Sequence, residues 1–360
     1  MLKRKSKRVL SIVLAVAMIV GLFPVAAFAE GGESATPVDQ NTETVATKLP
    51  GADKTGVIKL TSNVMLKDTY TISQDTTVTI DLAGFKITNA EGKHTIVNNG
   101  NLTISDTSAE KNGTVDNISH ARAALFNNPT GTVTLNGGTF DRSQENENSP
   151  DNSGNNSFYT IRNYGKMTIN SGTTVRQKGH FSSMVTNGWY NVSNPSGQSE
   201  PIDTSSTPTL IINGGTFTGG LNTIKNDDKG VLIINDGNFS NVAQSVVQNH
   251  NITTIAGGTF TTTPGEGSPA ETYVIDNHGI SAPNNCGTLT ISGGTFSGAT
   301  YALWDRSVAG SNAQISISGG SFEGETAIAK HLRPTAIFPL PAVLSKIQKK
   351  EQLLQVLTSS

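Results

Sequence analysis

Short segments in which aliphatic and polar residues alternate recur through most of the chain. In Leu289–Ile291, for example, Thr290 lies between two aliphatic residues. A period of two is typical of a half-buried β-strand, which points its aliphatic residues inward and its threonine outward. We therefore predict a strand at each equivalent segment, namely 102–104, 133–135, 167–169, 210–212, 232–234, 253–255, 289–291 and 315–317.

Two further patterns accompany these strands. A preceding strand ends in an aliphatic residue, any residue and Asn, at 96–98, 125–127, 161–163, 185–187, 224–226, 247–249 and 275–277, with Asp in place of Asn at 303–305. Most of the strands are followed by a Gly-Gly-Thr-Phe-like sequence, which we interpret as a turn, with its aromatic residue at Phe140, Phe217, Phe239, Phe260, Phe296 and Phe322. Together the three patterns form one repeating unit.

The repeat has a minimum period near 22 residues. Asn226 and Asn249 are 23 positions apart, and Phe217 and Phe239 are 22 apart, whereas longer intervals carry polar insertions. A period of 20–50 residues built from strands indicates a solenoid. The sequence thus predicts about nine or ten coils, stacked about 4.8 Å apart.

Stacking gives the repeated Asn and Phe residues a structural role. An Asn amide can bond to the equivalent amide of the next coil, which satisfies polar groups inside a dry core. A Phe can stack on the Phe of the next coil, and the glycine pair suits a turn that a Cβ would hinder. We interpret most of the repeat as scaffold.

Composition and the two ends of the chain add a boundary prediction. Gly accounts for 37 of 360 residues and charged residues for 15%, as expected of many short strands joined by turns. Residues 1–29 combine a basic start, an apolar run and an Ala-Phe-Ala site, which predicts a secretory signal peptide. We assign 30–55 to a polar linker, 56–329 to the β-helix and 330–360 to a non-repeat tail, either a capping helix or a truncated end.

Charge and cysteine content limit the binding partners and the disulfides that the sequence predicts. Without residues 1–29 the chain would carry a net charge of −7, which argues against nucleic acid. Cys286 is the single cysteine, so no internal disulfide is expected. No metal or cofactor motif is present, and we predict no metal, no cofactor and no membrane insertion after signal cleavage.

The repeat resembles the right-handed parallel β-helix of the pectin-lyase-like superfamily, and more narrowly the ISGGTF-repeat surface proteins of Gram-positive gut bacteria. The opening GVIKLTSNVMLKDTYTISQDTTVTIDLAGFKIT (56–88) is similar to the first coils of such proteins. The resemblance implies an all-β, single-stranded right-handed parallel β-helix. It does not fix a function, because the fold carries lyases, hydrolases, adhesins and inert stalks.

Variable positions on this scaffold are the candidates for binding. If the residue before each Asn points outward, one exposed column results: Val97, Phe126, Arg162, Thr186, Lys225, Gln248, Asp276 and Trp304. Aromatic faces stack on sugar rings, so we predict a carbohydrate site at Trp189, Tyr190, Trp304, Arg162, Lys225 and Asp276. The alternative is that Trp189 and Tyr190 pin their own loop and Trp304 packs against a neighbouring coil.

An enzyme must also be considered. Polygalacturonase-like hydrolases of this fold use clustered carboxylates, a Gly-His-Gly turn and an Arg-x-Lys pair, and the nearest groups here are Asp227, Asp228, Asp276, His278 and Arg306. Paired carboxylates could supply acid and base. The match is poor, because Asn277 precedes His278 and no Lys follows Arg306 at two positions.

Two other functions, calcium-dependent lyase and ice binding, fit the sequence less well. A calcium-dependent lyase needs converging carboxylates, which are sparse on the predicted strands. The outward threonines that would suit ice binding are interrupted by Ile211 and Ile233.

We predict a monomeric, non-catalytic bacterial protein, secreted or on the cell surface, that binds a polysaccharide or a host or cell-surface glycan. The alternative is a polysaccharide hydrolase or lyase.

Overall fold

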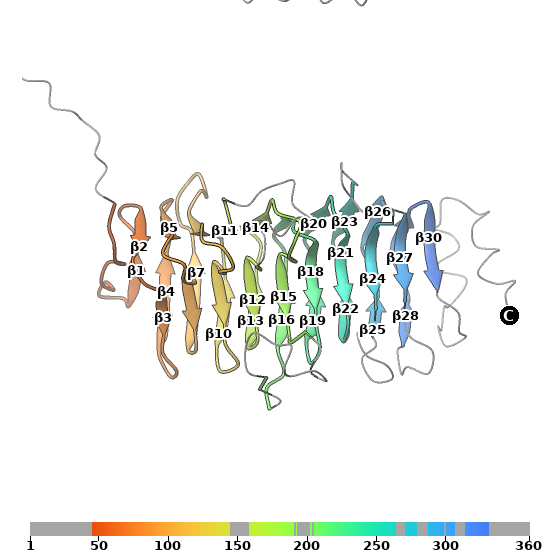
Figure 1. Cartoon of the computed structure of the whole chain (residues 1–360), viewed down its shortest axis with the longest axis horizontal. Coiled ribbons are helices and arrows are strands. Elements are labelled where there is room, and N and C mark those ends of the chain that lie inside the picture. The colour runs from red at the N-terminus through yellow and green to blue at the C-terminus, as the bar shows by residue number, and fades with distance from the viewer. Residues whose placement is uncertain are drawn as a thin grey trace, which may run out of the picture. The chain divides into compact units, whose positions relative to one another are not determined.

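The chain winds through three parallel sheets in turn. The computed structural model describes residues 45–144, 158–190, 192, 202–203, 205–263, 271–278, 287–298, 300–306 and 314–330. Each strand pairs in parallel with the strand three places later, so every third strand belongs to the same ten-stranded sheet (Figure 1). We call these sheet 1, sheet 2 and sheet 3, and one strand of each makes a coil. The result is a parallel β-solenoid of ten coils, as the period predicts.

The strands are three to five residues long. Sheet 1 contains β1 (Val57–Lys59), β4 (Thr77–Asp81), β7 (Asn101–Ser105), β10 (Thr132–Leu135), β13 (Lys166–Ile169), β16 (Thr209–Ile212), β19 (Val231–Ile234), β22 (Ile252–Ile255), β25 (Thr288–Ile291) and β28 (Ile315–Ile317). Sheet 2 contains β2 (Val64–Leu66), β5 (Lys86–Asn89), β8 (Thr114–Asn117), β11 (Gly138–Asp141), β14 (Thr173–Gln177), β17 (Thr216–Gly219), β20 (Asn238–Asn241), β23 (Thr259–Thr262), β26 (Thr295–Gly298) and β29 (Ser321–Glu323). Sheet 3 contains β3 (Tyr70–Ile72), β6 (Ile96–Asn98), β9 (Leu125–Asn127), β12 (Ile161–Asn163), β15 (Val185–Asn187), β18 (Asn222–Asn226), β21 (Ser245–Asn249), β24 (Tyr273–Asn277), β27 (Tyr301–Asp305) and β30 (Thr326–Lys330).

The alternation in sheet 1 works as predicted. In β25, Leu289 and Ile291 are buried while Thr290 is exposed. The inward residues of all three sheets belong to one core that runs from Ile58 to Ile328. Each coil therefore buries its aliphatic side chains against the coils beside it, which is the main driving force for stacking.

The Gly-Gly-Thr-Phe sequences turn at their glycines as predicted, but their Thr and Phe residues belong to strands, which corrects the sequence prediction in part. Their Thr and Phe residues lie in sheet 2, and the second glycine of the pair makes the preceding corner with φ between +102° and +109° at Gly215, Gly258, Gly294 and Gly320. A residue with a Cβ would be strained there. The phenylalanines stack as predicted, with ring centroids 4.6–4.8 Å apart along Phe217, Phe239, Phe260, Phe296 and Phe322.

The asparagines that end the strands of sheet 3 form the predicted ladder. Each side-chain Nδ2 donates to the side-chain oxygen one coil further on, over 2.7–3.2 Å, from Asn98 through Asn127, Asn163, Asn187, Asn226, Asn249 and Asn277 to Asp305. In several coils the turn beside the ladder holds a glycine whose place a side chain could not take. A Cβ on Gly131 would lie 2.1 Å from Asn127 Oδ1, and one on Gly230 would lie 2.3 Å from Asn226 Oδ1.

A second amide ladder, on the surface, was not foreseen. Asn136, Asn170, Asn213 and Asn235 lie at the corner between sheets 1 and 2 and bond to one another in order over 2.7–2.9 Å. The chain thus contains a buried and an exposed version of the same interaction.

Most of the predicted terminal segments lie outside the residues that the structure describes. Residues 1–29, 331–360 and Cys286 lie outside the described residues. Within the predicted linker, Ala46 pairs with Val64, and Ala46 and Leu49 pack against the core. This stretch covers the first coil because its apolar side chains reach an otherwise open sheet end. No helix long and apolar enough to cross a membrane occurs among the described residues.

Candidate functional site

The residues before the ladder asparagines do line up in register on sheet 3. Strand pairing places Arg162 beside Thr186 and Thr186 beside Lys225. It also places Gln248 beside Asp276 and Asp276 beside Trp304. The predicted column is therefore real as a row of neighbouring side chains. Its position on the outer face of sheet 3 makes it the place to look for a site.

The prediction that this column is exposed is wrong for most of its members. The residues from the third to the eighth coil are buried, with at most 8% of their surface exposed: Phe126, Arg162, Thr186, Lys225, Gln248 and Asp276. Val97 and Trp304 are partly exposed. The cause is a second layer of side chains, from residues after the strands and from the insertions, that packs over the outer face of sheet 3.

At the third to fifth coils this layer is aromatic. Phe126, Tyr164 and Trp189 form a buried cluster outside the main core. Trp189 is fully buried, stacks on Tyr164 with ring centroids 4.8 Å apart, and pairs its backbone with Asp228. Trp189 is therefore a packing residue in this structure, as the loop-pinning alternative holds, whereas its neighbour Tyr190 is 49% exposed.

Arg162 is part of the same packing. Its guanidinium carbon lies 4.8–5.6 Å from the ring centroids of Phe126, Phe158, Tyr159 and Tyr164. Contacts of a guanidinium with aromatic faces are favourable, and more so when water is excluded. Arg162, predicted as a ligand contact, thus serves to hold the aromatic layer together in this structure.

His94 borders this layer and makes a pH prediction possible. Its Nδ1 accepts the Ala123 N–H at 2.8 Å. Burial, and then the charges of Arg122 and Arg162, lower the pKa of His94 from 6.5 to about 4. Below pH 6.5 the unfolded chain therefore takes up a proton that the folded chain does not, and stability falls as pH drops toward 4.

We expect this histidine to remove up to about 3 kcal/mol of stability between pH 6.5 and pH 4. Urea midpoints measured across that range should fall less steeply for His94→Gln than for the wild type. His120→Gln, which changes an exposed histidine, should keep the wild-type slope. Parallel curves for His94→Gln and the wild type would contradict the assignment.

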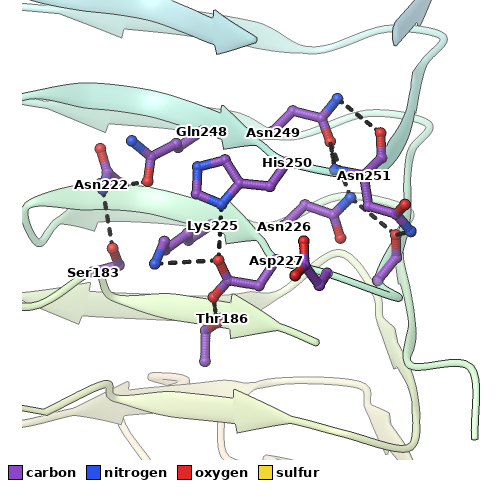
Figure 2. A network of polar contacts seen from close by, with 12 residues as sticks. Ser183, Thr186, Asn222, Lys225, Asn226, Asp227, Gln248, Asn249, His250 and Asn251 are labelled. Carbon is purple, nitrogen blue, oxygen red and sulfur yellow. Dashed lines mark hydrogen bonds and ion pairs between the residues drawn. The ribbon is translucent and has the colours of Figure 1, made fainter. Parts of the chain in front are cut away.

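From the fifth coil, at Thr186, to the ninth the layer is polar and charged. We call it the sheet 3 polar cluster: Thr186, Lys225, Asp227, Gln248, His250, Asp276, His278 and Arg306. Asp227 is its first centre (Figure 2). Its carboxylate is 3.2 Å from Lys225 Nζ and 3.0 Å from His250 Nδ1, and it accepts the Thr186 hydroxyl at 3.0 Å. Three partners from three coils thus converge on one carboxylate.

These contacts keep both Asp227 and Lys225 charged. Burial opposes ionisation of Asp227, but the Lys225 ammonium and the His250 hydrogen bond outweigh burial and lower the pKa of Asp227 to about 2. Burial acts against the Lys225 charge as well, and the carboxylate of Asp227 more than offsets it, so the pKa of Lys225 is raised. The Tyr190 ring covers Lys225, with Nζ 4.3 Å from its centroid. Lys225 and Asp227 therefore form a shielded ion pair at neutral pH.

Asp276 is the second centre. Arg306 donates to both carboxylate oxygens, with Nε at 2.8 Å from Oδ1, and Gln248 Nε2 donates at 3.1 Å. Burial disfavours the Arg306 charge, but the hydrogen bond to Asp276 raises the pKa of Arg306. A forked arginine–carboxylate contact of this kind is among the stronger ion pairs in proteins.

Two histidines join the two centres. His250 and His278 pack edge to face with ring centroids 5.4 Å apart. Each has one buried ring nitrogen without a hydrogen bond, Nε2 in His250 and Nδ1 in His278. Burial lowers the pKa of His278.

The structure places one predicted carboxylate elsewhere. Asp228 accepts the Val192 N–H at 2.8 Å, and burial raises its pKa. Asp227, Asp276, His278 and Arg306, by contrast, all lie in the polar cluster. His250 was missed by sequence reasoning, although the residues that follow the last three ladder asparagines and Asp305 are Asp227, His250, His278 and Arg306 in successive repeats.

An aromatic patch lies beside the second centre. Trp304 is partly exposed, and its ring centroid lies 4.9 Å from Tyr273 and 4.5 Å from Tyr301. Arg306 lies over Trp304, and both tyrosine hydroxyls face Glu271. The patch presents a partly exposed ring next to charged and hydroxyl groups.

The cluster therefore holds its charges in neutral pairs. Among the residues that the structure describes, no three or more His, Cys, Asp or Glu side chains gather closely enough to hold a metal ion by themselves.

Comparisons with protein-family models, with curated proteins and with solved structures found no match to this chain.

Proposed function

We propose that the chain is an exported protein of the cell surface or the extracellular medium that binds carbohydrate without cleaving it. In this proposal its solenoid is a right-handed parallel β-helix of the pectin-lyase-like type, similar to the ISGGTF-repeat surface proteins. The partner is a polysaccharide or a host or cell-surface glycan.

The observation that carries the proposal is the aromatic patch at Trp304. A sugar ring has an apolar C–H face that suits an aromatic side chain, and its hydroxyls suit adjacent charged groups. Trp304 offers part of its ring beside Arg306 and Tyr301. Tyr190 adds an exposed ring over Lys225, on the same face and three coils away in register.

Pairing of the charges supports binding over catalysis. A hydrolytic acid and base need two carboxyl groups with separated pKa values and access to the substrate. Asp227 and Asp276 are almost fully buried, and each is bonded to a cationic side chain. These carboxylates are better suited to holding the outer layer in place.

The test is glycan-array binding of the whole chain. Trp304→Ala should weaken binding at least about tenfold, which corresponds to 1.4 kcal/mol, whereas Trp304→Phe should retain most of it. Phe181→Ala, which removes an exposed aromatic residue outside sheet 3, is the matched control. Equal binding by Trp304→Ala and the wild type would remove this patch from the site.

A polysaccharide-degrading enzyme is the second candidate. Convergence of acidic and basic side chains on neighbouring coils, at Asp227, His250 and Asp276, is the feature that favours it. A reducing-sugar assay on the glycans that bind separates the two. Release that disappears in a combined Asp276→Asn and His278→Gln variant would establish the enzyme.

A further inference from the structure

His250 and His278 occupy the same place on adjacent coils. Each follows a ladder asparagine, Asn249 or Asn277, and each backbone N–H donates to the carbonyl of the ladder asparagine one coil earlier, over 2.8 and 2.9 Å. Their ring centroids are 5.4 Å apart. The repeat itself thus sets two imidazoles side by side.

Both rings keep a buried nitrogen that bonds to nothing. His250 is only 2% exposed, yet its Nε2 has no hydrogen bond, and the Nδ1 of His278 is likewise buried and unpaired. Buried polar atoms are nearly always paired, so an exception points to a missing ion, water or role. Two exceptions on neighbouring rings point to one shared cause.

The carboxylate of Asp227 fixes which nitrogen of His250 is available. Since an ionised carboxylate only accepts hydrogen bonds, the Nδ1 of His250 must donate to it over 3.0 Å. In the neutral ring Nε2 then carries the lone pair, and Figure 2 shows this nitrogen without a contact to Asp227. A histidine that donates one N–H to a carboxylate and keeps the other nitrogen free is the usual form of a metal-binding histidine.

We propose that His250 Nε2 and His278 Nδ1 together bind one divalent transition-metal ion of the zinc or copper type, with Asp227 as the positioning residue. Imidazole nitrogen suits these ions, and two rings that share an ion at Zn–N distances of about 2.0–2.1 Å have centroids roughly 5 Å apart. The carboxylates of Asp227 and Asp276 offset the charges of Lys225 and Arg306, so no net positive charge opposes the ion.

This inference departs from the sequence-based expectation of no metal and is independent of the proposed sugar binding. With two protein ligands, the remaining coordination positions are taken by water. His278 is only partly buried, so those positions open toward its side of the cluster.

The test is calorimetric titration of the whole chain with Zn²⁺ alone. We expect one Zn²⁺ per chain, and at least about tenfold weaker binding in both His250→Gln and His278→Gln, as for loss of one of two ligands. His120→Gln is the matched control and should bind as the wild type does. Electron paramagnetic resonance with Cu²⁺ should detect two imidazole nitrogens in the wild type and one in each single variant.

Asp227→Asn tests the positioning role and should weaken Zn²⁺ binding about 10- to 100-fold. Melting curves without metal test whether each variant is folded. If Asp227→Asn is not folded, the two histidine variants still test the metal site. A wild type that binds no Zn²⁺ at millimolar concentration, or equal losses in His120→Gln, would overturn the proposal. The unpaired nitrogens would then reflect edge-to-face packing of the two rings.

Discussion

Phe260→Ala is expected to lower the free energy of unfolding by about 3–5 kcal/mol, the usual cost of deleting a buried phenyl ring. Phe260 is fully buried and lies between Phe239 and Phe296, with centroid distances of 4.6 and 4.8 Å. Because the stacked rings above and below are held by their own strands, the gap cannot close by collapse. Guanidinium denaturation followed by circular dichroism measures the loss.

The neighbouring residue supplies the control for this prediction. Thr261 lies on the same strand, β23, and is only partly buried, so Thr261→Ala should change stability by about 0.5 kcal/mol or less. Phe260→Leu should fall between the two, since it keeps part of the buried volume. A loss below 1 kcal/mol for Phe260→Ala would mean that the stack is not a structural element of the core.

The fold was predictable because its signals are local and repeated. A period-two alternation such as Leu289–Ile291 fixes which side chains face the core, and the spacing of Asn226 and Asn249 fixes the coil length. The error in the predicted strands and turns concerned Gly-Gly-Thr-Phe, where the glycine pair suggested a turn and obscured the strand that starts at Thr216.

The candidate site was less predictable, because what covers sheet 3 does not repeat. The period of two correctly places Lys225 and Gln248 next to each other on the outer face of sheet 3. Polar residues on an outer face are expected to be exposed. Their burial depends on single residues such as Tyr190 and on ion pairs across coils, as between Asp276 and Arg306. Neither leaves a periodic signal in the sequence.

The two amide ladders show why exposure decides the worth of a repeated contact. The buried ladder includes Asn226, and the surface ladder includes Asn213, with similar geometry. A hydrogen bond contributes modestly when its groups can return to water, but a buried group left without a partner costs about 1–3 kcal/mol. The same substitution should therefore have very different effects in the two ladders.

Asn226→Leu is accordingly expected to destabilise the protein by at least about 3 kcal/mol, because it leaves more than one buried polar group without a hydrogen-bond partner. Asn226 Oδ1 accepts from Asn187 at 2.9 Å, while its Nδ2 donates to Asn249 at 3.1 Å and to the Gly230 carbonyl at 3.1 Å. A leucine satisfies none of these partners. Urea denaturation of the whole chain measures the change.

Asn213→Leu is the matched control, because it breaks the same kind of ladder at an exposed position. Water replaces the lost partners there, so the cost should stay below about 1 kcal/mol. Comparable losses in the two variants would show that the buried amides do not determine how the coils are held together. A large loss confined to Asn226→Leu would instead place the specificity of coil stacking in this one interior row, since a shift of two residues would keep every aliphatic side chain on its own face.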